Sequence, residues 1–405
     1  MMNDERMAES VYADSIPSQE GDGMKIVLAP DSYKGTLTAV QVCETMERGI
    51  REELPDAEFD WIPMADGGEG TLEVIVNAAD GQFVEISAAG PFGKPIRAQI
   101  GHIRQREESW AVIESARLFG LPMLAPAERN PLHTTSRGLG DAIRSALDLG
   151  FRKMVIGLGG SSTNDGGMGM LAALGARFAD GNGEELFGFG RDLAAVEQAD
   201  LSKLDARLAE CTLIAASDVT NPLLGAQGAT RIYGPQKGAD PEMVEQLEQA
   251  MARYANLVEN ASGVRCAEST GAGAAGGLGF ALLTLGARIQ PGTEAIAGLC
   301  ELADRIKRAD CVVTGEGSSD AQTLYGKLPI QVAKFAAEAG KPVFLLSGSL
   351  GDNWPALLPY FSACLSTVTR PAKLEECLSQ AEQNLYAAAR NLGRLLAVKR
   401  PGPFA

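Results

Sequence analysis

A repeated unit constrains the fold of this chain most: a short apolar run ends in a glycine-bearing polar loop, and a helical pattern follows. It first occurs in "MKIVLAP" (24–30) and in the helical pattern that Thr38 opens, where Gln41 completes a capping box. The strand-like run 58–64 and the helical run 71–79 repeat it. Strands that alternate with helices in this way predict a parallel sheet covered by helices.

The same alternation returns near residue 291. We expect one helix over "TEAIAGLCELADRIKRA" (293–309), then a strand in "DCVVTG", a helix in "LPIQVAKFAAEAG" and a strand in "KPVFLLSGS". Between the two alternating regions, the strand-like runs "QFVEISAAG", "IRAQIGHIR" and "SWAVIESA" follow one another without a helix. This pattern indicates an antiparallel or mixed sheet in the middle of the chain.

We therefore predict an α/β protein of two domains with the active site in the cleft between them. Residues 24–82 plus 291–400 would form a discontinuous, doubly wound Rossmann-like domain, and residues 83–290 an inserted α/β domain with a mixed sheet. Residues 1–23 are polar and acidic and lack the apolar segment of a signal peptide. We expect them to be a disordered N-terminal extension, and the protein to be cytoplasmic.

Composition excludes several classes of partner. The net charge of −16 is opposite to what a non-specific nucleic-acid binder needs. No run of about 18 apolar residues occurs, so we expect no membrane span. The seven cysteines are scattered without a C-x-x-C pair, which is typical of free thiols in a reducing compartment. We therefore expect small-molecule ligands, with neither nucleic acid nor membrane as a partner.

Polar, glycine-bearing loops follow the predicted strands or lie beside them. They are "APDSYKGTLT" (29–38), "PMADGGEGT" (63–71), "GLGGSSTNDGG" (157–167), "SDVTNPLLG" (217–225) and "TGEGSSDAQTLYGK" (314–327). Glycine lets backbone N–H groups approach a ligand closely, and successive N–H groups form a nest for an anion. Carboxylates in the same loops are the oxygen ligands that Mg²⁺ prefers. Together the loops predict a site that handles phosphate.

Known nucleotide-binding motifs are absent or out of place. The chain has no G-x-x-x-x-G-K-[ST] sequence and no H-R-D or D-F-G set, which excludes a P-loop enzyme and a protein-kinase fold. "GAGAAG" (271–276) matches G-x-G-x-x-G, but a poor strand precedes it and it lies deep in the chain. We interpret this match as close helix packing between small residues rather than as a dinucleotide site.

Taken in order, the loops resemble those of the glycerate kinase family of bacterial type. The matching stretches are "APDSYKGTLTA", "PMADGGEGT", "TTSRGLG", "GLGGSSTNDGG", "SDVTNPLLG", "GPQKGA", "GAGAAGGLGF" and "TGEGSSDAQTLYGKLP". They extend from about residue 29 to 329, and the helix and strand patterns fit to about 390. Tyr33 stands where the family often has phenylalanine.

The resemblance implies a kinase that uses ATP and Mg²⁺ to phosphorylate D-glycerate. Its product would be 2-phosphoglycerate in preference to 3-phosphoglycerate, which would feed glycolate, glyoxylate or sugar-acid carbon into glycolysis. Phosphoryl transfer depends mainly on positioning and on neutralising charge, and an aspartate can accept the proton of the attacking hydroxyl. We hypothesise that the catalytic residues are Lys34, Asp66, Asp165 and Asp218.

Other residues of these loops are candidates for contacts with the metal, the phosphates or the substrate. The candidate metal ligands are Asp165, Asp218 and Glu316. The candidate substrate and phosphate contacts are Asp31, Ser32, Gly35, Gly67, Gly68, Thr71, Gly159, Gly160, Ser161, Ser162, Thr163, Asn164, Asn221, Lys237, Gly273, Gly276, Gly277, Glu316, Asp320, Thr323 and Lys327.

Three alternatives remain at this point. A kinase for another small hydroxy acid or polyol would use the same loops. A non-catalytic two-domain binding protein would have a cleft, but has no need for so many acidic loop residues beside lysines. A nicotinamide-dependent dehydrogenase needs a glycine fingerprint after the first strand, which "APDSYKG" does not supply.

Overall fold

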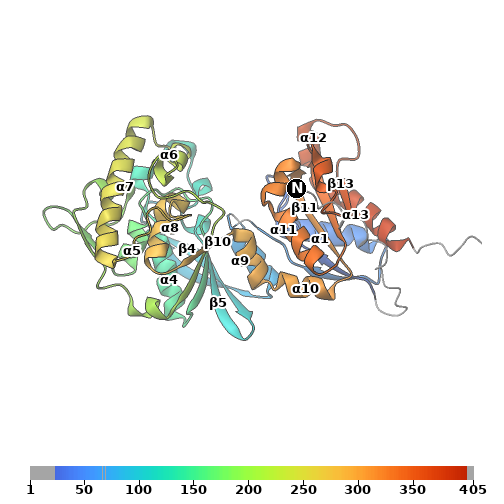
Figure 1. Cartoon of the computed structure of the whole chain (residues 1–405), viewed down its shortest axis with the longest axis horizontal. Helices are drawn as coiled ribbons and strands as arrows, with labels where there is room; N and C mark the ends of the chain where they lie inside the picture. Colours follow the sequence, from blue (N-terminus) through green and yellow to red (C-terminus); the bar gives the residue numbers. More distant parts are fainter. Residues whose placement is uncertain (1–22, 66, 69, 399–405) are drawn as a thin grey trace, which may run out of the picture.

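The computed structural model describes residues 23–65, 67, 68 and 70–398. The predicted disordered extension therefore lies outside the described residues, except for Gly23. The described chain forms two large sheets, each covered by helices, and one small two-stranded sheet (Figure 1). In this part of the chain no helix is long and apolar enough to cross a membrane. All seven cysteines are free thiols, as expected.

One large sheet has five strands, all parallel, in the order β13-β12-β11-β1-β2. The strands are β1 (Lys25–Leu28), β2 (Glu58–Trp61), β11 (Cys311–Ser319), β12 (Val343–Leu350) and β13 (Ala363–Ser366). The strand order reverses between β1 and β11, so this is the doubly wound sheet that the alternation predicts. In such sheets ligands bind beyond the carboxyl ends of the strands at the reversal.

Helices cover both faces of this sheet because successive side chains of a strand point to opposite faces. Val27 and Val312 pack against one set of helices, whereas Leu28 and Val313 pack against the other. The first set is α9 (Gly292–Leu299), α10 (Leu302–Arg308) and α11 (Leu328–Glu338), and the second is α1 (Ala39–Arg51) and α13 (Ala381–Ala397), which α12 (Leu374–Ser379) precedes.

Two helix predictions in this region have opposite outcomes. The capping box of α1 is confirmed: the Gln41 backbone N–H donates to the Thr38 hydroxyl, and the Gln41 side chain accepts from the Thr38 N–H. The single helix expected over 293–309 is wrong. Glu301 adopts a left-handed conformation with φ of 52°, which ends α9 and starts α10 in a new direction.

The second large sheet has six strands in the order β10-β9-β6-β5-β4-β3. The pairs β3–β4 and β4–β5 are antiparallel and the others parallel, which confirms the predicted mixed sheet. The strands are β3 (Gln82–Ala89), β4 (Pro95–Gln105), β5 (Glu108–Glu114), β6 (Lys153–Gly157), β9 (Thr212–Ala216) and β10 (Arg288–Gln290). The small sheet pairs β7 (Arg177–Ala179) with β8 (Gln198–Asp200).

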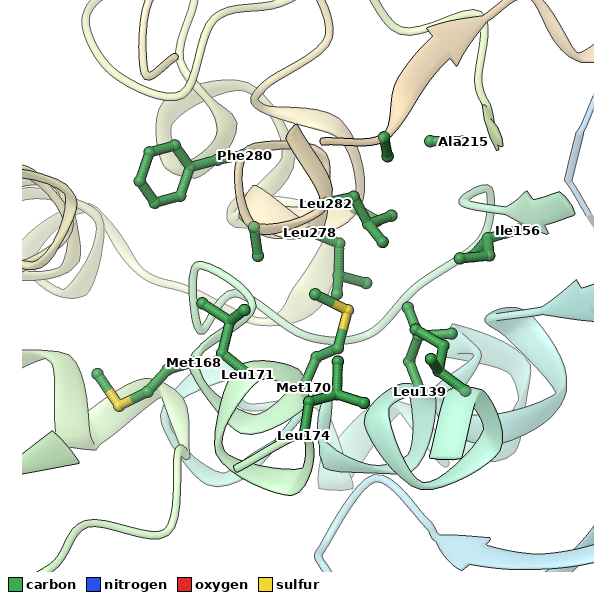
Figure 2. Packing of buried hydrophobic residues seen from close by; sticks show 14 of the residues in the cluster. Leu139, Ile156, Met168, Met170, Leu171, Leu174, Ala215, Leu278, Phe280 and Leu282 are labelled. Atoms are coloured by element: carbon green, nitrogen blue, oxygen red, sulfur yellow. The ribbon is translucent and has the colours of Figure 1, made fainter. Parts of the chain in front are cut away.

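The helices of this part form its hydrophobic core against the sheet. They are α3 (Ala116–Phe119), α4 (Arg137–Asp148), α5 (Met168–Ala173), α6 (Ala229–Tyr233), α7 (Pro241–Ser262) and α8 (Ala274–Thr284). Figure 2 shows Met170 and Leu171 of α5 directed toward Leu278 of α8, with Leu139 of α4 beside them. All four side chains are buried, so the core fixes the loops that enter and leave these helices.

Helices α2 (Thr71–Ala78) and α9 lie between the two large sheets. Leu72 and Ile296 belong to one hydrophobic cluster that contains Val27 of the five-stranded sheet and Val112 and Val155 of the six-stranded sheet. The loops that precede these two helices are therefore held between strand ends of both sheets. The domain boundaries at residues 82 and 291 stay predictions.

Candidate active site

Two cavities, of about 1010 and 1260 Å³, open beside each other at the carboxyl ends of β1 and β9. We call them the first and the second cavity. They share a wall, whose residues are Asp31, Ser32, Lys34, Thr36, Ser217, Asp218 and Val219. The shared wall thus joins the loop after β1 in one sheet to the loop after β9 in the other.

The loop after β1 is held in place by Tyr33. Its backbone exchanges hydrogen bonds with Leu37 at 2.9 and 3.0 Å, and its buried hydroxyl donates to the Leu346 carbonyl at 2.9 Å. Burial, and the nearby charge of Glu316, raise the pKa of Tyr33 far above its ordinary value. The fixed turn presents Asp31 and Lys34 to both cavities.

Asp218 reaches the shared wall from the loop after β9. Its Oδ1 atom accepts the Gly292 N–H at 3.0 Å, at the first residue of α9. Ser217 beside it donates its N–H to the Gln290 carbonyl at 2.9 Å, which ties the loop to β10. A carboxylate at the start of a helix is stabilised by the backbone N–H groups there. The Gly292 N–H therefore fixes the Asp218 carboxylate beside both cavities.

The second cavity lies where the strand order reverses, and β11 contributes to it. The strand predicted in "DCVVTG" (310–315) continues to Ser319 because Glu316, Ser318 and Ser319 still pair with β12. Glu316 is 8 % exposed; its Oε1 atom accepts from the hydroxyls of Ser319 at 2.9 Å and Thr323 at 2.7 Å. The Lys327 ammonium lies 3.7 Å from its Oε2 atom.

Lys327 and Glu316 line the second cavity, whereas two other predicted residues near them do not belong to its described lining. Thr323 is buried and donates to Glu316, so it orients that carboxylate. Asp320 caps the short turn Ala321–Tyr325 by accepting the Gln322 N–H at 2.8 Å. Thr323 and Asp320 therefore stabilise residues around the second cavity without belonging to its described lining.

Glycine loops from both sheets meet at the first cavity. Gly67, Gly68, Gly159 and Gly160 line it, as does Gly35. The Gly159 N–H donates to the Gly67 carbonyl at 3.2 Å, and a Cβ atom on Gly159 would meet the Gly68 Cα at 2.4 Å. The glycines thus permit two loops to pack against each other and leave backbone on the cavity wall. 

Thr71, predicted as a ligand contact, is buried just outside the described lining of the first cavity. Its hydroxyl donates to the Gly68 carbonyl at 2.7 Å. Glu114 and Arg117 do line this cavity, and neither was predicted as a site residue. Glu114 ends a strand and Arg117 follows it in "VIESAR", which contains neither glycine nor proline.

Asp165 is fully buried and does not belong to the described lining of either cavity. One oxygen accepts from the backbone N–H and the hydroxyl of Ser136, both at 2.7 Å, and also from the Gly169 N–H at 3.3 Å; the other accepts the Gly167 N–H at 3.0 Å. Burial raises the pKa of Asp165, and these hydrogen bonds oppose the rise. The contacts give Asp165 a structural place between α4 and α5.

The neighbours of Asp165 are also buried in the scaffold rather than at a cavity. The Ser162 hydroxyl donates to the Phe119 carbonyl at 2.8 Å, and the Asn164 amide to the Thr230 hydroxyl at 3.0 Å. Thr163 accepts through its backbone carbonyl from Lys237. Ser161, Ser162, Thr163 and Asn164 thus lie behind Gly159 and Gly160, which alone of this loop reach the described cavity lining.

Lys237 anchors this loop from within. It is 3 % exposed, and its ammonium donates to the Ser161 hydroxyl at 3.1 Å and to the Thr163 carbonyl at 2.7 Å. Burial lowers the pKa of Lys237 to about 7, although the charge of Asp165 acts in the opposite direction. Lys237 therefore stabilises a loop rather than lining a described cavity.

The remaining predicted residues hold loops together at a distance from both described linings. A Cβ on Gly276 would meet the Thr163 carbonyl oxygen at 2.1 Å, and one on Gly277 the Gly166 Cα at 2.6 Å. The match "GAGAAG", with buried Gly273, is therefore close packing of α8 on the 163–167 loop. The Asn221 side chain bridges the Gln227 carbonyl and the Tyr233 hydroxyl.

The carboxylates at the two cavities fit a magnesium ion that is bound jointly by the protein and by the phosphates of a substrate. Among the described residues no group of three or more His, Cys, Asp or Glu side chains gathers as a metal site. Mg²⁺ in such sites is held by one or two carboxylates, while substrate phosphates and water supply the other ligands. Of the predicted ligands, Asp218 and Glu316 line the second cavity, and Asp165 does not. Asp66, which was predicted as a catalytic residue, lies outside the described residues.

Comparison with known proteins places the chain in a family. The profile of the glycerate kinase family matches residues 26–397. A glycerate kinase from Haemophilus influenzae is 41% identical over 93% of this chain and 100% of its own length, and a glycerate 2-kinase from Escherichia coli is 42% identical over 93% and 98%.

A crystal structure supports the same relationship. It is of a protein from Salmonella typhimurium LT2, provisionally named glycerate kinase 2, and aligns with a TM-score of 0.83 and 43% sequence identity. The alignment covers 93% of this chain and 98% of the other. The chain belongs to the glycerate kinase family and is a phosphotransferase.

Proposed function

We propose that this protein transfers the γ-phosphoryl group of ATP to the 2-hydroxyl of D-glycerate, giving 2-phosphoglycerate and ADP. The observation that carries the proposal is the wall that the two cavities share, with Asp31, Lys34 and Asp218 in it. Direct transfer needs two bound molecules whose reacting atoms lie about 3 to 3.5 Å apart. Two cavities that meet at a lysine and two carboxylates meet this need.

The second cavity suits the nucleotide. It is the larger one, and it lies at the carboxyl edge of a doubly wound sheet where the order reverses, the usual ligand position in such folds. Its lining combines apolar side chains for a base, such as Leu374 and Leu378, with Lys34 and Lys327 for phosphates. Glu316 would hold Mg²⁺, which neutralises charge on the β- and γ-phosphates.

The first cavity suits glycerate, whose carboxylate and hydroxyls are small and polar. Its wall offers backbone of the glycine loops, the hydroxyl of Ser217 and the ammonium of Lys34. Asp218 accepts the proton of the 2-hydroxyl as that oxygen forms its bond to the γ-phosphorus. The bond from phosphorus to the bridging oxygen breaks, and ADP leaves with that electron pair. Lys34 lies in the wall where negative charge gathers during transfer.

Different evidence applies to each of the three alternative functions. Membership of a kinase family argues against a dehydrogenase and a non-catalytic binding protein. A kinase for another hydroxy acid is tested by comparing D-glycerate with L-glycerate, D-lactate and glycerol. Since the seven thiols are all free, we also propose the cytoplasm as the location, where the product enters glycolysis.

An enolase-coupled assay tests the position of transfer. Enolase consumes 2-phosphoglycerate directly, whereas 3-phosphoglycerate must first pass through phosphoglycerate mutase. We expect phosphoenolpyruvate to form from ATP and D-glycerate when enolase is added without mutase. A signal that appears only after mutase is added would contradict transfer to the 2-hydroxyl while leaving a kinase in place.

A further inference from the structure

A buried carboxylate from the six-stranded sheet holds the start of α2 at the first cavity. Glu114, the last residue of β5, is 2 % exposed and lines this cavity. Its Oε1 atom accepts the Gly70 N–H at 3.1 Å, and its Oε2 atom accepts the Leu72 N–H at 2.9 Å. One side chain thus fixes two backbone groups that are 42 or more residues away in the sequence.

Helix α2 depends on this contact because its own sequence supplies no cap. Gly70 occupies the capping position with φ of 87°, and glycine has no side chain that could accept a hydrogen bond. The first N–H groups of a helix have no partner within the helix. Glu114 satisfies two N–H groups there, and its negative charge lies at the positive end of the helix dipole.

Two backbone N–H groups and an arginine surround the buried carboxylate of Glu114. Burial raises the pKa of Glu114, whereas the two backbone N–H groups and Arg117 oppose the rise. The Arg117 Nε atom lies 3.9 Å from Glu114, and its Nη2 atom lies 2.6 Å from Glu73. Arg117 thus bridges Glu114 to the first turn of the helix that Glu114 caps.

We propose that Glu114 is a positioning residue that fixes the backbone of Gly70 and Leu72, and with it the adjoining wall of the first cavity, and so places the acceptor substrate for reaction. Gly67, Gly68 and Gly70 all line this cavity, and the Gly67 carbonyl is held on its other side by the Gly159 N–H. The assignment of that substrate to D-glycerate rests on the proposed function.

The chain offers a matched control in Glu259. This carboxylate also accepts two backbone N–H groups, from Cys266 at 2.8 Å and Ala267 at 2.9 Å, and pairs with Arg265 at 3.0 Å. It does not belong to the described lining of either cavity. Glu259→Ala therefore removes the same kind of contact at a distance from the described site.

Steady-state kinetics of the full-length enzyme distinguish positioning from plain stability. For Glu114→Ala we expect kcat/KM for D-glycerate to fall about 100-fold, since a displacement near 1 Å has an effect of that size. The KM for ATP should stay within about twofold. Both alanine variants should lower the thermal midpoint of unfolding by a similar amount. Glu259→Ala should nevertheless leave both KM values and kcat unchanged. Equal kinetic losses in the two variants, or equal rises in both KM values of Glu114→Ala, would overturn the proposal.

Rescue experiments remain decisive if Glu114→Ala is unstable. Glu114→Gln keeps the shape and one acceptor oxygen, so it should lie between wild type and the alanine variant. Added formate can occupy the space left in Glu114→Ala and accept the same N–H groups, so it should restore part of the activity. Wild-type kinetics of Glu114→Gln would contradict the proposal. Residual activity of Glu114→Ala that formate does not increase would also contradict it.

Hydrogen exchange separates this inference from the proposed function. Peptides that contain Gly70 and Leu72 should exchange faster in Glu114→Ala than in wild type, and at the wild-type rate in Glu259→Ala. This result does not depend on the substrate. A wild-type protein without activity on D-glycerate would defeat the proposed function, whereas unchanged exchange at residues 70–72 would defeat the role of Glu114.

Discussion

At the scale of single residues, Asp165 and Asp218 show how similar glycine-rich loops place aspartates in different roles. Asp165 is buried and accepts four hydrogen bonds that join α4 to α5. Asp218 is exposed at the wall of both cavities and accepts the Gly292 N–H at the start of α9. Of the two, only Asp218 lies where a substrate hydroxyl could reach it.

Substitution of each aspartate by asparagine should separate stability from catalysis. Asp165→Asn places an amide among N–H donors, so it should lower the free energy of unfolding by about 2 to 4 kcal/mol. Asp218→Asn keeps an acceptor for Gly292, so unfolding should change by less than about 0.5 kcal/mol while turnover falls at least about 100-fold. Urea unfolding and kcat measure the two effects. Near-normal turnover of Asp218→Asn would remove it as the general base.

Lys237 should make stability depend on pH in a way that a neutral side chain does not. Its pKa is lowered to about 7 in the folded chain, against an ordinary value of 10.5. Between these values the unfolded chain binds more protons, so stability rises with pH. The difference in unfolding free energy between wild type and Lys237→Met should therefore shift in favour of wild type from pH 7 to pH 10. A difference that stays constant over this range would contradict a buried, neutralised lysine.

Sequence reasoning identified Asp31, Lys34, Asp218 and Lys327, which line the cavities, because they stand in polar loops after predicted strands. It could not identify Glu114. That residue matters only because a helix start from a distant segment lies against it. Lys237 and Asp165 were also predicted as site residues, although they do not belong to the described cavity linings. A buried loop of the scaffold and a ligand-binding loop contain the same residue types, so the sequence does not separate them.

At the scale of elements, the glycine loops after β2 and β6 form one interlocked unit. A loop from the five-stranded sheet and one from the six-stranded sheet approach so closely that Gly159 has no room for a side chain. The glycines were predictable as loop residues. Their role in bringing two loops into contact was not, because it depends on how α2 and α9 pack between the sheets.

Adding one methyl group should therefore have opposite effects at two glycines. Gly159→Ala forces the loops apart, and we expect it to lower the free energy of unfolding by more than about 2 kcal/mol and to reduce activity. A Cβ atom on Gly298 in α9 would meet no described atom within 4 Å beyond its chain neighbours and the adjoining helix backbone, so Gly298→Ala should raise the free energy of unfolding by about 0.5 to 1 kcal/mol. Chemical denaturation of both variants measures this. Equal stability of the two would contradict the interlocked loops.

The helices that were predicted well carry strong local signals at their ends. Thr38 and Gln41 begin α1 as a capping box, and Pro329 lies in the first turn of α11. The break between α9 and α10 carries no such signal, since Glu301, which adopts the left-handed conformation there, is neither glycine nor proline. The continuation of β11 to Ser319 similarly depends on pairing with β12, which the sequence of β11 does not contain.

At the scale of the whole molecule, the loops at the carboxyl ends of strands in both large sheets line the two cavities. The class of each sheet was predictable from the order of strand and helix patterns along the chain. The strand order β13-β12-β11-β1-β2 was not, although it puts the ends of β1 and β11 beside the second cavity. The shared wall follows from this arrangement, since it takes one loop from each sheet.

If the two cavities hold a phosphoryl donor and glycerate at this shared wall, the protein transfers phosphate from one to the other. ³¹P NMR of the purified, full-length protein with Mg-ATP and D-glycerate follows this transfer. We expect loss of the ATP resonances, growth of the ADP resonances and one new monoester resonance that matches authentic 2-phosphoglycerate. ATP that stays unchanged in the presence of the folded protein and D-glycerate would contradict it.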